Sequence, residues 1–304
     1  MIKKSAKPFL KWAGGKTQLI SEIEKNLPNS TIDTYIEPFV GSGAVLFWIL
    51  GEFVLLKKAV VNDINEDLMN TYKTIQSTPK ELITILENLQ YEYHSLEKSE
   101  DKKKEYYYQK REFFNNRKQN QTEHSALFIF LNRTCFNGLY RVNRKNEFNV
   151  PMGSYVKPAI CDKSNLIAVS EALQKVEILC GDFEQTINYV GLNTLFYFDP
   201  PYKPLSETSS FNSYAKDEFN DDEQIRLKNF CKKLDVLGHS WILSNSDVRG
   251  KNAEDNFFDD LYSDFIIKRV DAKRSINANP EKRGKLTELL INNFQNLYYE
   301  RVHF

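Results

Sequence analysis

Three short strand-like segments each end at a turn of glycine or polar residues, and this repeated pattern constrains the fold more than any other feature of the chain. The segments are Tyr35–Phe39 before Gly41, Ala59–Val61 before Asp63, and the apolar run before Asp199. Alternation of such strands with helices predicts an α/β protein. Because open α/β sheets bind ligands beyond the carboxyl ends of their strands, the three turns are the first candidates for a functional site.

The rest of the chain continues this pattern after a long interruption. Ala44–Leu50 predicts an apolar helix, so the chain opens with a βαβ unit. Glu66–Asn120 is charged and helical, with an apolar face along Leu82–Leu89. Strand patterns then return at Val176–Leu179, Thr194–Phe198, Ser240–Leu243, Phe265–Val270 and Glu288–Asn292.

The interruption predicts a separate helical lobe. A helix over Ala126–Leu131 leads into a long polar loop that runs from Arg133 to Gly153, and such loops commonly carry function. We predict a catalytic domain formed by residues 1–65 and 163–304, and a helical recognition domain formed by residues 66–162.

Composition excludes several classes of protein. The 304 residues are 41% hydrophobic and 27% charged, as in folded globular proteins. The start is rich in lysine and the longest apolar run is too short to cross a bilayer, so we expect a cytoplasmic protein without membrane contact. The four cysteines and four histidines form no cluster, so we expect no metal and no disulfide framework. The basic stretch Lys102–Lys118 is either a solvated helix face or a contact for nucleic acid.

The segment Asp199-Pro200-Pro201-Tyr202 is the most specific motif. Proline fixes φ and lacks a backbone donor, so the turn is stiff and presents oxygen acceptors. The Asp199 carboxylate and the Pro200 carbonyl can hold both N–H groups of an exocyclic amine and direct its lone pair at a methyl carbon. Tyr202 offers a flat face on which a base can stack. The alternative is a plain proline turn at the end of a strand.

The turn Gly41-Ser42-Gly43 lets the backbone approach a ligand, and the carboxylate of Asp63 can take both hydroxyls of a ribose. The two together suit an adenosine-containing ligand, although a lone glycine turn is commonly only a turn. A dinucleotide fingerprint needs a third glycine, and Leu46 stands there. A nicotinamide-dependent oxidoreductase is therefore disfavoured.

Taken in order, these motifs resemble the Dam/DpnM-type class alpha (D12) DNA adenine-N6 methyltransferases. The resemblance implies a Rossmann-like sheet that binds S-adenosyl-L-methionine, an inserted helical DNA-recognition domain, and double-stranded DNA as substrate. It spans nearly the whole chain. The matching segments are Phe9–Lys16, Glu37–Gly43, Asn62–Asn65, Asn132–Arg141, Phe148–Gly153, Gly181–Phe183 and Asp199–Tyr202.

The resemblance also implies which residues bind the cofactor. Trp12 and Lys16 close over it, Phe39 and the glycine turn line its methionine part, and Asp63 binds its ribose. At the adenine end, Phe183 stacks and Asp182 accepts a hydrogen bond from the amine. Ser244-Asn245-Ser246 resembles a loop after the next strand that supports the pocket. The implied cofactor contacts are Trp12, Ala13, Gly14, Lys16, Phe39, Gly41, Ser42, Gly43, Asp63, Ile64, Asp182, Phe183 and Asp199.

An enzyme that modifies a paired base must first take the base out of the stack. Arg133 and Arg141 suit phosphate or guanine edges, Phe136 can wedge between bases, and Asn137-Gly138 permits a sharp turn. The resemblance further implies that Phe136 intercalates, Leu139 touches a thymine methyl group, Arg141 reads a guanine, and Lys11 contacts the first base. The expected DNA contacts are Lys11, Arg133, Phe136, Asn137, Gly138, Leu139, Arg141 and Pro151.

The close match of Asn132–Gly153 favours GATC as the target. Some relatives carry an arginine where this chain has Ser154, so the base contact expected there is either absent or supplied by Tyr155 or Lys157. N4-cytosine methylation is disfavoured because position 199 is Asp rather than Ser. A non-catalytic DNA-binding protein on the same fold is the remaining alternative. Both a solitary enzyme and a partner of a restriction endonuclease, without an obligate complex, are compatible with the sequence.

Overall fold

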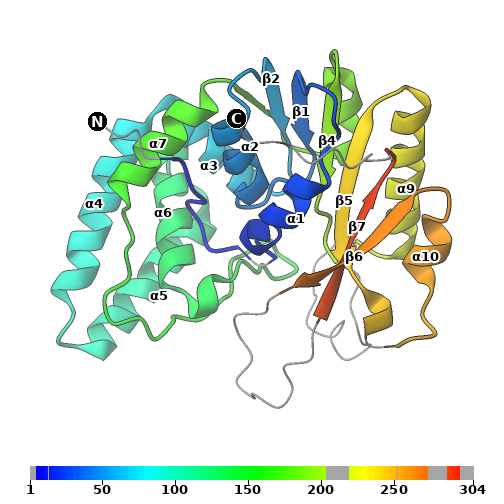
Figure 1. Ribbon diagram of the computed structural model, residues 1–304. Helices are drawn as coiled ribbons and strands as arrows, with labels where there is room; N and C mark the ends of the chain where they lie inside the picture. Colours follow the sequence, from blue (N-terminus) through cyan, green and yellow to red (C-terminus); the bar gives the residue numbers. More distant parts are fainter. Residues whose placement is uncertain (1–4, 13, 203–218, 251, 273–285, 295–304) are drawn as a thin grey trace.

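A computed structural model describes residues 5–12, 14–202, 219–250, 252–272 and 286–294. In these residues a seven-stranded sheet has the order β3-β2-β1-β4-β5-β7-β6, with a group of helices packed on one side of it (Figure 1). The α/β fold class is therefore confirmed. The strands are β1 Thr34–Glu37, β2 Lys58–Val61, β3 Val176–Ile178, β4 Thr194–Phe198, β5 Ser240–Ser246, β6 Ile266–Ala272 and β7 Leu286–Asn292.

The strand order of the sheet reverses between β1 and β4. From β1 the chain moves outward to β2 and β3, and from β4 it moves the other way to β5. These five strands pair in parallel, and β7 then pairs antiparallel with both β5 and β6. A parallel sheet that reverses in this way opens a crevice at the carboxyl ends of the two central strands.

The helices lie on both sides of the strands. In Figure 1 the cyan and green helices α3 to α6 lie to one side of the strands, with the yellow α9 at the other side. The helices are α1 Ile20–Lys25, α2 Ala44–Glu52, α3 Glu66–Ser77, α4 Pro79–Ser95, α5 Glu100–Asn116, α6 Gln121–Thr134, α7 Lys163–Leu173, α9 Asp221–Val236 and α10 Phe257–Leu261.

Local sequence explains where these helices begin. Asn120 and Glu123 form a capping box at α6, in which each side chain bonds a backbone N–H of the other. At α5 and α9 the side chains of Ser99 and Asn220 likewise accept a hydrogen bond from the backbone N–H three residues later, and Pro79 occupies the first turn of α4. The predicted helical run Glu66–Asn120 is therefore three helices, and its apolar face on α4 is buried as predicted.

One continuous core joins the sheet to the helical region. Tyr35 and Val61 from the sheet belong to the same buried cluster as Leu86 and Phe130 from the helices. α3 packs against α6 and also contacts α7 and β3. The two parts are thus held rigidly together by buried apolar surface.

One prediction about local structure was wrong. Ser244-Asn245-Ser246 is part of β5 and pairs with β7, although its polar residues indicated a loop. Pairing with β7 supplies hydrogen-bond partners for the backbone of this segment, and the buried Asn245 side-chain amide donates to the side-chain oxygen of Gln224. Most of the basic stretch Lys102–Lys118 is exposed, including Lys102, Lys104 and Lys118. Two of its members have contacts within the protein, because Lys103 donates to the Val156 carbonyl and Arg111 to that of Val150.

Gly43 and Gly238 provide a matched test of the glycine turn. Both have φ near the left-handed helix, at +76° and +78°. An added Cβ at Gly43 would lie 2.6 Å from the Tyr72 hydroxyl, whereas at Gly238 nothing lies within 4 Å. We expect Gly238→Ala to lower the free energy of unfolding by about 1–2 kcal/mol. Gly43→Ala should lower the free energy of unfolding by about 1–3 kcal/mol more than Gly238→Ala does, as measured by urea denaturation. Equal losses would contradict this packing.

Candidate active site

The glycine turn and Asp199 lie together where the strand order reverses. β1 and β4 are neighbours in the sheet, so the turns that follow them meet at one edge. A small cavity of about 20 Å³ opens between them. It is lined by Trp12, Gly14, Gly15, Lys16, Glu37, Val40, Gly41, Ser42, Ala44, Val45 and Asp199. Three motifs that are far apart in the sequence therefore share one site, at the place where α/β sheets bind ligands.

Asp199 is held at the end of β4 by two side chains. Its Oδ1 lies 2.9 Å from the Lys16 ammonium and accepts a hydrogen bond from the Ser244 hydroxyl at 3.1 Å. Burial raises the pKa of Asp199 to about 6, because the effect of burial outweighs the stabilising contacts of Lys16 and Ser244. This carboxylate is therefore an acceptor whose charge changes near neutral pH.

The other members of the motif are fixed as well. The Pro201 carbonyl accepts a hydrogen bond from Gln224, while the Pro200 ring is buried. The Tyr202 hydroxyl donates to Glu288 at 2.7 Å, and the Lys16 ammonium lies 4.4 Å from the centre of the Tyr202 ring. The ring is thus anchored at its hydroxyl and has a cation on its face.

The glycine turn is bonded directly to Asp63. Oδ2 of Asp63 accepts the Gly41 N–H at 3.1 Å, and Oδ1 accepts the Asn65 N–H at 3.0 Å. Burial raises the pKa of Asp63 in spite of these bonds. Ile64 stands beside it with 70% of its surface exposed. The predicted ribose carboxylate and a free apolar side chain therefore lie at the rim of the same turn.

The Trp12 to Lys16 segment covers the cavity. A Cβ added to Gly41 would lie 3.1 Å from Cδ1 of Trp12, so the indole rests on the glycine turn. The Lys16 ammonium also donates to the Gly14 carbonyl at 2.5 Å, which directs it toward Asp199. Ser42 is buried at the base of the turn, and Ala13 lies outside the described residues.

Asp182 and Phe183 are engaged with Arg226 in this structure. The Asp182 carboxylate accepts both Nη1 and Nη2 of Arg226, at 3.1 and 2.7 Å, and this contact lowers the pKa of Asp182. The guanidinium lies 4.2 Å from the centre of the Phe183 ring, which is only 4% exposed and packs on Phe39. Sequence reasoning missed Arg226, which is far from both residues along the chain.

The predicted DNA-contacting loop presents apolar side chains to solvent. Phe136 is 50% exposed and Leu139 is 38% exposed, so neither is a core residue. Asn137 and Gly138 both have positive φ, at 53° and 65°, which gives the sharp turn that was predicted. The Phe136 N–H donates to the carbonyl of Pro151, which closes the base of the turn.

Lys11 lies beside this loop because Asn132 joins them. The Asn132 side chain accepts the Lys11 N–H and donates to the carbonyls of Lys11 and Gly138, all within 3 Å. Arg141 donates to the side-chain oxygen of Asn149 at 2.7 Å. Asn132 was quoted only as part of a motif, and its role as the connection between two segments depends on the fold.

Arg133 does not lie on the loop. It belongs to the last turn of α6, and its Nη2 donates to the Phe9 carbonyl at 2.7 Å. Burial lowers the pKa of its guanidinium. The DNA contact of Arg133 stays a prediction, and in this structure its guanidinium holds the N-terminal segment against α6.

Two acidic residues of the site were missed. Glu37 is buried at the end of β1 and lines the cavity, and burial raises its pKa well above the ordinary value. Its only signal was a carboxylate inside an apolar strand. Glu288 on β7 gave no signal, because only the antiparallel pairing of β7 with β5 brings it to Tyr202.

Comparison with known proteins decides the family. A model of the D12 class N6 adenine-specific DNA methyltransferases matches residues 12–276. The chain belongs to this family. Type II methyltransferase M.MjaIII of Methanocaldococcus jannaschii is 52% identical over 293 residues, which are 95% of this chain and 99% of that protein. The DNA adenine methylase of Haemophilus influenzae is 36% identical over 285 residues, 93% of this chain and 92% of that protein.

Solved structures give a more distant likeness. The rRNA methyltransferase aviRa from Streptomyces viridochromogenes covers 94% of this chain with a TM-score of 0.35 and 10% identity, which is too remote to bear on function.

Membership in the D12 family implies adenine-N6 methylation of DNA with S-adenosylmethionine as the methyl donor. The residues present suit such a donor in their chemistry, because a glycine turn and the Asp63 carboxylate are bonded side by side. In this structure the Trp12 indole occupies the space next to Gly41. Among the described residues, no helix has the length and apolarity needed to cross a membrane. The same residues contain no group of three metal-ligating side chains.

Proposed function

We propose that this chain methylates N6 of an adenine that has left the DNA duplex, within a short target that is GATC. The observation that supports this most is that Lys16 connects the glycine turn with Asp199. Lys16 lines the glycine-turn cavity and also forms an ion pair with Asp199 at 2.9 Å. A donor in the glycine turn and an amine at Asp199 would thus be neighbours.

The Asp199 corner is proposed to hold the target amine. The Asp199 carboxylate and the Pro200 carbonyl accept its two N–H groups, and the ring of Tyr202 supports the base. In the present structure the Lys16 ammonium uses the same carboxylate oxygen. We infer that Lys16 leaves Asp199 when the site is loaded and pairs with the carboxylate of the donor. Ser244 keeps Asp199 in place while this happens.

The donor-binding residues are proposed to be those of the glycine turn and its neighbours. S-adenosylmethionine supplies a methyl group activated by a sulfonium. Trp12 covers its methionine part, the Glu37 carboxyl group lies within reach of the cavity, and Asp63 takes the ribose hydroxyls. Asp182 and Phe183 hold the adenine end, which requires the Arg226 guanidinium to move from the face of Phe183. The proposed donor contacts also include Gly14, Phe39, Gly41, Ser42, Gly43 and Ile64.

The helical region, residues 66–162, is proposed to read the DNA. Phe136 fills the gap left by the extruded base, because an exposed aromatic on a tight turn suits insertion between bases. Leu139, Arg141 and Lys11 contact neighbouring bases. GATC rests on the resemblance of Asn132–Gly153 to the family. The relatives' names include both a type II methyltransferase and a DNA adenine methylase, so either context suits the chain.

Replacement of Asp199 tests its role directly. Asp199→Ala removes the acceptor of the target amine, so we expect at least a hundredfold loss of N6-methyladenine formation. Donor binding, measured by calorimetry, should be largely retained because the glycine turn and Asp63 are unchanged. Asp264→Ala is the control, since this aspartate is exposed and pairs only loosely with Lys232. Undiminished methylation by Asp199→Ala would reject the assigned role.

The pH profile tests the charge of the same residue. Only the ionised carboxylate is a full acceptor, and the pKa of Asp199 is raised to about 6. We therefore expect kcat/KM for DNA to rise with pH through about 6 and to level off above it, because this parameter reports the free enzyme. Circular dichroism at each pH separates this effect from unfolding. A flat profile between pH 5 and 8 would contradict the assignment.

Defined duplexes test target and base extrusion together. GATC duplexes should be methylated at adenine, and duplexes with one base changed should react far more slowly, since each changed base pair costs about 1–3 kcal/mol. A mismatch opposite the target adenine should speed the reaction, because it lowers the cost of extrusion. Equal rates on paired and mismatched targets would argue against extrusion, and methylated cytosine would favour the N4-cytosine alternative.

A further inference from the structure

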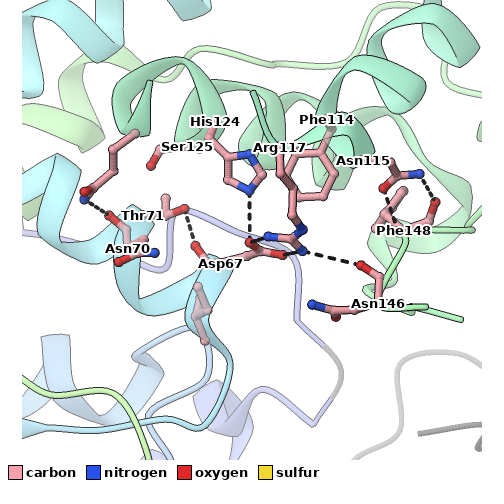
Figure 2. A network of polar contacts seen from close by, with 12 residues as sticks. Asp67, Asn70, Thr71, Phe114, Asn115, Arg117, His124, Ser125, Asn146 and Phe148 are labelled. Carbon is pink, nitrogen blue, oxygen red and sulfur yellow. Dashed lines mark hydrogen bonds and ion pairs between the residues drawn. The ribbon is translucent and has the colours of Figure 1, made fainter. Parts of the chain in front are cut away.

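Asp67, at the start of α3, is a buried carboxylate that none of the site assignments uses. It is 4% exposed, and four hydrogen-bond donors reach it. Arg117 donates to both oxygens at 2.8 and 3.0 Å, His124 donates to Oδ1 at 2.9 Å, and Tyr140 donates to Oδ2 at 2.9 Å. Figure 2 shows Arg117 and His124 converging on it. A carboxylate has about four acceptor positions, so Asp67 is fully used.

The four donors come from three separate segments of the helical region. Arg117 ends α5, His124 lies on α6, and Tyr140 lies in the loop between Leu139 and Arg141. Arg117 also donates to the Asn146 carbonyl, at 3.4 Å, beyond that loop (Figure 2). One carboxylate therefore joins the helices to the loop that presents the proposed DNA contacts.

The contacts of Asp67 favour its ionised form. Burial alone would raise the pKa of Asp67, but the hydrogen bonds from His124 and Arg117 outweigh it and hold the pKa well below the usual range. Arg117 has φ of 50°, a left-handed conformation that is unfavourable for residues other than glycine. The bidentate ion pair with Asp67 maintains this conformation, as over-determined contacts do at functional positions.

Asp67 is also attached to the donor-binding side. It lies in the first turn of α3, whose N-cap residue is Asn65. The backbone N–H of Asn65 is bonded to Asp63, the proposed ribose ligand, and Asp63 is bonded to Gly41. Two hydrogen bonds therefore connect the glycine turn to the first turn of α3, which carries Asp67.

Tyr140 contacts the donor side at a second point. Its ring stacks on the indole of Trp12, with centres 5.7 Å apart and planes inclined by 21°. Trp12 in turn rests on Gly41. The hydroxyl of Tyr140 thus bonds Asp67 while its ring packs on the proposed cofactor cover, and its two chain neighbours are Leu139 and Arg141.

We propose that Asp67 and Tyr140 are positioning residues that hold the DNA-reading loop Phe136–Arg141 in register with the donor-binding segments, so that donor and DNA strengthen each other's binding. This rests on the assignment of that loop to DNA made under the proposed function. The linkage is reciprocal, so the same factor applies to both ligands.

Tyr140→Phe tests this with the smallest change, because it removes only the hydroxyl and keeps the stacking on Trp12. The dissociation constant of S-adenosylhomocysteine, which has no methyl group to transfer, is measured with and without a saturating GATC duplex. We expect the wild-type protein to bind it about tenfold more tightly with DNA, within the usual range of such coupling. In Tyr140→Phe the ratio of the dissociation constant without DNA to that with DNA should fall to within about twofold of one. The affinity for S-adenosylhomocysteine without DNA should stay unchanged.

Tyr106→Phe is the matched control, because its hydroxyl also donates to a carboxylate, Glu92, in the same helical region but away from the site. It should keep the wild-type ratio. Asp67→Asn should abolish the coupling as well, and a thermal melt shows whether it remains folded. Three results would overturn the proposal. The first is that DNA leaves the affinity of the wild-type protein for S-adenosylhomocysteine unchanged. The others are that Tyr140→Phe keeps the same gain in affinity as the wild-type protein, or that Tyr106→Phe and Tyr140→Phe reduce this gain equally.

Arg141→Ala separates this inference from the proposed function. If it leaves discrimination between GATC and altered duplexes unchanged, the assignment of the loop to DNA is wrong. If it relaxes discrimination while Tyr140→Phe retains full coupling, the loop reads DNA but Asp67 and Tyr140 do not link it to the donor site.

Discussion

The pairing of β1 with β4 is the constraint on which the rest of the structure depends. It brings the turn after Gly41 and the turn after Asp199 to one edge of the sheet, although the chain between them includes the whole helical region. Lys16 lines the cavity beside the first turn and forms an ion pair with Asp199. Because the strands are buried on both sides, neither turn can move without disturbing the core, so the distance between donor site and acceptor corner is set by backbone pairing.

The features that the sequence predicted well are local. Strands that end in special turns could be recognised from apolar runs and from residues such as Gly43 and Pro200, which require particular backbone conformations. The predicted strand Thr194–Phe198 agrees with β4 residue for residue. Ser244–Ser246 could not be recognised as a strand, since its polar residues are stabilised by pairing with a strand far along the chain.

The features that could not be predicted are long-range polar contacts. Arg133 was predicted to contact DNA and Arg226 was not singled out, yet one holds the N-terminal segment and the other covers Phe183. Asp67 was not singled out either, because it is one acid in a charged segment. Its partners are 50 or more residues away, so only the packing of α3, α5 and α6 reveals the cluster. Such buried polar centres specify how elements sit relative to one another, because an unpaired buried charge is costly.

The most direct measurement is a structure of the protein with S-adenosylhomocysteine and a GATC duplex. The account predicts an adenine outside the helix, with its N6 about 3 Å from a carboxylate oxygen of Asp199, and Lys16 withdrawn from that oxygen. An adenine still stacked in the duplex would contradict it. So would an extruded base whose amine lies away from an Asp199 that remains paired with Lys16.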